Sequence, residues 1–64
     1  MYKIRLIRKA QKISGWELAR MTGISLQSVY RYEKGERTPK VDDLVKIAKA
    51  LRVDVTDLID VRGR

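Results

Sequence analysis

Residues 18–33 constrain this chain most, because they combine a small residue, a turn glycine and a helix cap at the spacing of two short helices joined by a tight turn. Ala19 lets a second helix approach closely, and Gly23 can take the positive φ that ends a helix in a sharp turn. Ser25 offers its hydroxyl as the N-cap of the next helix. Val29 falls on the inward side of that helix. The stretch therefore predicts a helix-turn-helix.

The rest of the chain follows the helical period, so the sequence predicts an all-α fold without strands. Five helices are expected, over residues 2–11, about 15–22, 26–33, about 41–51, and a short last helix after Asp54 that contains Leu58 and Ile59. A capping box of Ser14 and Glu17 begins the second helix, and Gly35 ends the third.

Apolar spacing assigns the inward faces of these helices. The expected inward residues are Ile4, Ile7 and Ala10 with Leu6 beside them, Val29 and Tyr32, and then Val41, Leu44, Val45, Ile47, Ala48 and Leu51. At 64 residues, the chain is expected to form one compact five-helix domain over residues 1–64, with 61–64 as a frayed tail.

Positive charge is concentrated in the first part of the chain. The net charge is +7: residues 1–40 hold ten Lys and Arg against three Glu, whereas residues 41–64 hold five groups of each sign. A solvated basic surface that keeps the protein soluble is one explanation, and a polyanionic partner is the other. The coincidence of this charge with the helix-turn-helix favours the polyanion.

Composition argues against several kinds of site. The chain has no Cys and no His, so it lacks thiolate metal ligands and the commonest general base. We expect no enzyme activity, no cofactor and no metal, and we interpret Asp54, Asp57 and Asp60 as caps and a solvated acidic edge. No apolar run exceeds two residues, so we expect no membrane helix and no signal peptide. A cytoplasmic location is compatible with this composition.

One ordered set of residues runs through most of the chain: Ile4-Arg5 with Ile7-Arg8, Leu18-Ala19, Gly23-Ile24-Ser25, Val29, Glu33-Lys34-Gly35 with Pro39, and Leu44 to Leu51. In this order and register, the sequence resembles the lambda-repressor-like (Cro/repressor type, XRE-like) helix-turn-helix DNA-binding domains. The resemblance implies a third helix that enters the major groove, usually in a dimer on a two-fold operator. It also implies an ion pair between Arg8 and Glu33 that fastens the first helix to the end of the third.

The start of the second helix departs from the family pattern. Members often carry a glutamine there that binds a backbone phosphate, and the matching residue here is Gly15, whose amide can still bind a phosphate at the helix terminus. Trp16 stands beside it, where the family tends to have a polar residue. We expect Gly15 and Trp16 to contact a phosphate. Packing of Trp16 over the first or third helix, or contact with a second subunit, are the alternatives.

The outward face of the third helix is the predicted reading surface. Gln27 and Arg31 are four residues apart and share a face. Glutamine can pair with adenine and arginine with guanine in the major groove. The predicted base contacts are Leu26, Gln27, Tyr30 and Arg31.

Two of the predicted base contacts, Leu26 and Tyr30, have alternative roles. Leu26 can touch a thymine methyl or form a local staple against Ile24 or Tyr30. Tyr30 can stack on a sugar, bond a phosphate, or pack partly against the protein.

Phosphate contacts position a reading helix without specifying sequence. Hydroxyl and cationic side chains flank the third helix at its ends and in the loop that follows. The predicted phosphate contacts are Ser25, Ser28, Lys34, Arg37, Thr38 and Lys40, together with Gly15 and Trp16.

These features predict a sequence-specific, double-stranded DNA-binding transcriptional regulator, most simply a repressor. The alternatives are an antitoxin-type regulator that also binds a partner protein, and a protein-interaction module that does not bind DNA. A homodimer on DNA is expected, with Val55, Ile59 and Val61 as exposed apolar groups at its interface.

Overall fold

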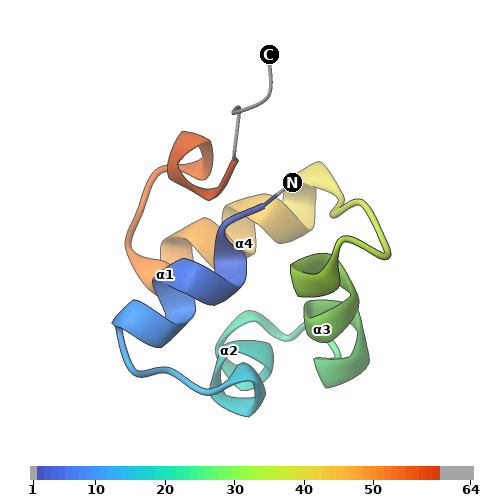
Figure 1. Cartoon of the computed structure of the whole chain (residues 1–64), viewed down its shortest axis with the longest axis horizontal. Helices are drawn as coiled ribbons and strands as arrows, with labels where there is room; N and C mark the ends of the chain where they lie inside the picture. Colours follow the sequence, from blue (N-terminus) through green and yellow to red (C-terminus); the bar gives the residue numbers. More distant parts are fainter. Residues whose placement is uncertain (1, 60–64) are drawn as a thin grey trace.

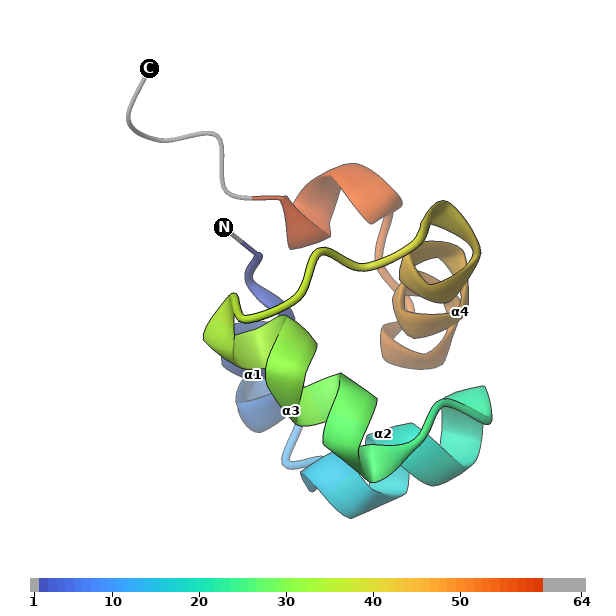
Figure 2. The same ribbon diagram turned by 90° about the vertical axis from the view of Figure 1, so that its right-hand side faces the viewer.

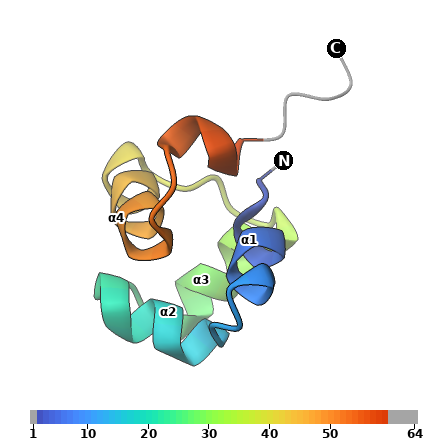
Figure 3. The same ribbon diagram turned by 90° about the vertical axis from the view of Figure 1, so that its left-hand side faces the viewer.

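A computed structural model describes residues 2–59 of the chain as four α-helices and one turn of 3₁₀ helix (Figure 1). The elements in chain order are α1 (Ile4–Ala10), α2 (Gly15–Thr22), α3 (Leu26–Lys34), α4 (Val41–Leu51) and the 3₁₀ turn η1 (Val55–Leu58). In all views α2 lies at the opposite end of the molecule from η1 (Figures 1 and 3). The predicted tail, residues 61–64, lies outside the described residues.

The two ends of the described chain differ from the prediction of five helices. Tyr2 and Ile59 form an isolated antiparallel bridge, and the amide of Lys3 donates to the carbonyl of Leu58 at 2.7 Å. Because this pairing keeps residue 2 extended, α1 begins at Ile4 and not at residue 2. The short last helix predicted after Asp54 is a single 3₁₀ turn that includes Leu58 but ends before Ile59, so the all-α prediction is confirmed and the count of five helices is met only by including this turn.

A single apolar core joins the helices. Its buried members are Ile4, Leu18, Ala19, Ile24, Val29, Tyr32, Leu44, Ile47, Ala48, Leu51 and Leu58. This core confirms the predicted inward faces of α3 and most of α4. It holds α2 against both α3 and α4.

Several residues predicted to face inward lie elsewhere. Val41 is 75% exposed, because it sits in the first turn of α4 at the edge of the buried stripe. Ala10 and Leu6 are exposed, and Val45 is only half-buried, whereas Ile7 is half-buried and packs against the core as predicted. In α1 the long side chain of Arg8 is buried together with Ile4, which the apolar spacing did not predict.

Local signals fix the helix ends that position α3. The Ser14 hydroxyl accepts from the Glu17 amide at 3.0 Å, and the Glu17 carboxylate accepts from the Ser14 amide at 2.9 Å. Gly23, with φ of 76°, ends α2 in the left-handed region that an L side chain rarely adopts. Ser25 then caps α3 by accepting from the Ser28 amide at 3.1 Å. These bonds confirm the predicted turn and both caps.

Candidate nucleic-acid interface

One side of α3 is buried and the other is free of the protein core. Val29 and Tyr32 are 0% and 1% exposed, respectively, whereas Gln27 and Arg31 are both exposed. Lys34 continues the exposed line one turn beyond Gln27 and Arg31. Figure 2 shows α3 nearest the viewer. Gln27 and Arg31, four residues apart, thus both lie on the exposed side of α3.

Tyr30 lies on the flank of α3 that faces the start of α2. A Cβ atom added to Gly15 would stand 2.5 Å from Cε1 and 2.7 Å from Oη of the Tyr30 ring. Tyr30 is 41% exposed, so its side chain packs beside the backbone of Gly15 and is still open to solvent. Leu26, on the same flank and 36% exposed, lies in the first turn of α3.

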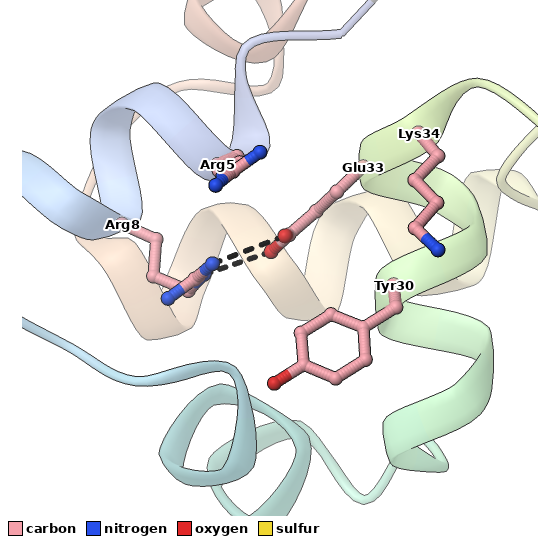
Figure 4. A pocket seen from close by; sticks show the side chains of 5 residues that line it. All are labelled: Arg5, Arg8, Tyr30, Glu33 and Lys34. Carbon is pink, nitrogen blue, oxygen red and sulfur yellow. Dashed lines mark hydrogen bonds and ion pairs between the residues drawn. The ribbon is translucent and has the colours of Figure 1, made fainter.

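The ion pair of Arg8 and Glu33 joins α1 to α3 (Figure 4). Arg8 Nε donates to Glu33 Oε2 at 2.8 Å, and Nη2 donates to Oε1 at 3.1 Å. A third donor, Nη1, bonds the carbonyl of Ile13 at 2.8 Å. The hydrogen bond and the negative charge of Glu33 raise the pKa of the Arg8 guanidinium above its usual value. The pair fixes the tilt of α3 against α1.

A hollow of about 410 Å³ opens beside this ion pair. It is lined by Arg5, Arg8, Tyr30, Glu33 and Lys34, and Figure 4 shows the hydroxyl of Tyr30 pointing toward the α2 end of it. Three cationic side chains face one carboxylate here, so the hollow favours an anion. Arg5 was not among the predicted contacts. Its position in the first turn of α1, where helix dipoles disfavour cations, was the available signal.

The opposite flank of α3 gathers hydroxyls and a guanidinium. The Ser28 hydroxyl accepts from the Ser25 hydroxyl at 2.9 Å and from Arg37 Nη1 at 3.4 Å. The Arg37 guanidinium also lies 5.7 Å from the centre of the Tyr32 ring, so the loop after α3 folds back along the helix. Thr38 and Lys40 follow in this loop and are exposed. The predicted phosphate contacts therefore flank α3 on both sides.

Trp16 is 57% exposed on α2 and is not among the side chains that pack against the apolar core. Its ring lies 5.5 Å from the guanidinium carbon of Arg20, one turn later on the same face of α2. Sequence reasoning gave Arg20 no role, although the spacing of four residues was a visible signal. The amides of Gly15 and Trp16 lie in the first turn of α2 and have no intrahelical acceptor, and Gly15 itself is buried beside the Tyr30 ring.

Other kinds of site find less support. Among residues 2–59 no group of three Asp or Glu residues is arranged to hold a metal ion. No helix in this part of the chain is long and apolar enough to cross a membrane. Val55 and Ile59, expected to be exposed at a dimer interface, are half-buried against the core and the N-terminal bridge, so that expectation was wrong for both. Val61 lies outside the described residues.

Comparison with known proteins assigns this arrangement to a family. The sequence is 43% identical, over 80% of its length, to the cryptic phage CTXphi transcriptional repressor RstR of Vibrio cholerae. It is 34% identical, over 92% of its length, to a protein named as an HTH-type transcriptional regulatory protein in Pyrococcus furiosus. The matched regions cover 46% and 19% of these relatives, so the chain spans less than half of either.

The family model confirms the resemblance found in the sequence. It carries the description helix-turn-helix and matches residues 4–58, which include every element from α1 to η1. The match covers the capped turn between α2 and α3 as well as the flanking helices that support it. The chain therefore belongs to the HTH_3 family of helix-turn-helix domains.

Proposed function

We propose that this protein is a non-enzymatic transcriptional regulator that binds double-stranded DNA by placing α3 in the major groove. The observation that carries the proposal is the exposure of Gln27 and Arg31 on one side of a helix whose other side is buried. A major groove about 12 Å wide admits one helix in this way. The names of the two relatives, a transcriptional repressor and a transcriptional regulatory protein, support the same function.

In this proposal, residues on the outer side and on one flank of α3 contact the bases. Gln27 pairs with an adenine edge and Arg31 with a guanine edge, since both side chains offer bidentate hydrogen bonds. Leu26 meets a thymine methyl at the first turn, and Tyr30 contacts the edge of the groove beside α2. Repression by occupation of an operator is the simplest mechanism for such a domain.

Phosphates on this proposal are bound on both flanks of α3. The proposed phosphate contacts are Gly15, Trp16, Ser25, Ser28, Lys34, Arg37, Thr38 and Lys40. If about five of these contacts form in each bound domain, log K should fall against log salt concentration with a slope of about −4.5. A homodimer on a two-fold operator, with half-sites roughly 34 Å apart, and a cytoplasmic location are further parts of the proposal.

Selection from random double-stranded DNA followed by sequencing tests this function. We expect enrichment of one two-fold motif, and binding of that motif with the salt dependence given above. Sedimentation on the selected duplex then measures how many copies of the chain bind. Absence of any enriched motif, together with binding that ignores salt, would contradict the proposal and favour a protein-interaction module.

A further inference from the structure

A second hollow lies between α2 and the first turn of α3. Its volume is about 440 Å³, and its lining residues are Trp16, Ala19, Arg20, Gly23, Ile24, Ser25 and Leu26. Trp16 and Arg20 come from α2, whereas Ser25 and Leu26 come from the start of α3. The surface that α3 presents to DNA on the proposed function therefore continues across this hollow onto the exposed side of α2.

Arg20 is a cation without an anionic partner among the residues that the structure describes. Among residues 2–59, Arg8 and Glu33 form the only ion pair within 4 Å, and the side chain of Arg20 donates no hydrogen bond to these residues. Its guanidinium lies instead over the Trp16 ring, 5.5 Å from the ring centre. Stacking on an aromatic ring engages the flat face of a guanidinium and leaves its N–H groups free at the edge. The stack thus leaves the N–H donors of the Arg20 guanidinium available at the rim of the hollow.

The lining of the hollow is mainly apolar, with Trp16, Ile24 and Leu26 among its residues. A sugar–phosphate strand matches this combination, because a deoxyribose offers an apolar surface and each phosphate offers an anion. We propose that Arg20, held against Trp16, binds a backbone phosphate of the DNA strand that passes the first turn of α3. The apolar part of the hollow then takes the adjoining deoxyribose. This inference rests on the proposed function.

A protein partner is the competing occupant, because exposed Trp and Arg side chains are also common in protein interfaces. Charge favours DNA over a protein partner, because the rim of the hollow carries the positive charge of Arg20. Position favours it too, since a partner seated in the hollow would cover Ser25 and Leu26, at the DNA-reading end of α3. The two occupants predict opposite results in the experiment below.

Salt-dependent binding of the selected duplex tests the role of Arg20. We expect Arg20→Gln to reduce the magnitude of the salt slope by about 0.9, so that its affinity deficit shrinks roughly threefold between 50 and 200 mM salt. Arg20→Lys, which keeps the charge, should keep the slope. Lys49→Gln is the matched control, because Lys49 is an exposed cation on α4 that borders neither hollow. Thermal melts should show all three variants folded, since each change is on the surface.

Trp16 supplies an independent readout, because it is the single tryptophan of the chain. We expect the selected duplex to protect its fluorescence from acrylamide quenching. A wild-type slope for Arg20→Gln would overturn the inference while leaving the proposed function intact. Equal quenching of the free and DNA-bound protein would overturn both the inference and the proposed phosphate contact of Trp16, but not the reading of bases by α3. If the wild-type protein binds no duplex, both the inference and the proposed function are contradicted.

Discussion

The phenol ring of Tyr30 occupies the space that a side chain at Gly15 would need, with Cε1 only 2.5 Å from the position of a Cβ atom there. This contact links the flank of α3 to the first turn of α2. Glycine within a helix is less stable than alanine, so helix propensity does not explain Gly15. The space that the Tyr30 ring requires explains why this position is a glycine.

A double-mutant cycle tests this contact between Gly15 and Tyr30. In the wild-type background we expect Gly15→Ala to change the free energy of unfolding by less than about 0.5 kcal/mol, because displacement of the ring offsets the gain in helix propensity. In the Tyr30→Ala background the same change should stabilise by about 0.5–1 kcal/mol. Urea denaturation of the four proteins measures both values. The same effect in the two backgrounds would show that the contact carries no energy.

Removal of Arg8 should destabilise the fold more than removal of Arg31. The side chains of Arg8 and Glu33 are only 8% and 4% exposed, so Arg8→Ala leaves a buried carboxylate unpaired and should cost about 3 kcal/mol. Arg31 is exposed, and Arg31→Ala should change the stability by no more than about 0.5 kcal/mol. Thermal melts compare the two variants directly. Equal melting temperatures would refute a structural role for the ion pair.

The helix-turn-helix could be predicted because its determinants are local. Ser14 and Glu17 are three residues apart and satisfy each other's backbone donors within one turn. Gly23 has the positive φ that ends α2, and Ser25 caps the helix that follows. The exposure of Gln27 then follows from the burial of Val29, because helical geometry relates neighbouring positions.

Features that depend on contacts between distant segments could not be predicted in this way. The start of α1 is set by the bridge between Tyr2 and Ile59, which no periodicity within either segment reveals. The return of Arg37 to Ser28 and the packing of Tyr30 on Gly15 depend equally on how separate elements meet. The candidate site is therefore predictable along α3 itself, and much less so at its flanks.

Tyr32 should make stability depend on pH in the alkaline range. Its hydroxyl donates to the Asp43 carboxylate, and this bond together with burial raises the pKa of Tyr32 above its usual value near 10. Because the pKa of Tyr32 is higher in the folded than in the unfolded state, its hydroxyl contributes fully to the free energy of unfolding below pH about 10. This contribution is lost as the pH rises through the folded pKa.

Tyr32→Phe isolates this contribution, because it removes the titrating hydroxyl and keeps the ring. We expect the stability advantage of the wild type over Tyr32→Phe to be constant below pH about 10 and to shrink as the pH rises above it. Chemical denaturation at several pH values measures the difference, in which the titration of lysines common to both proteins cancels. An advantage that stays constant across this range would contradict the proposed linkage.

Gln27 and Lys40 should affect DNA binding in different ways, because one faces the bases and the other a phosphate in the proposed complex. Gln27→Ala should reduce discrimination at one base pair by about 1–3 kcal/mol and leave the salt slope unchanged. Lys40→Gln should weaken binding evenly across sequences and reduce the magnitude of the slope by about 0.9. Fluorescence anisotropy with the selected duplex and its single-base-pair variants, at several salt concentrations, separates the two effects. Lys46→Gln, an exposed cation on α4, is the control for loss of charge alone. If Gln27→Ala weakened binding to every duplex equally, Gln27 would be a positioning residue, and sequence reading would have to come from other side chains of α3.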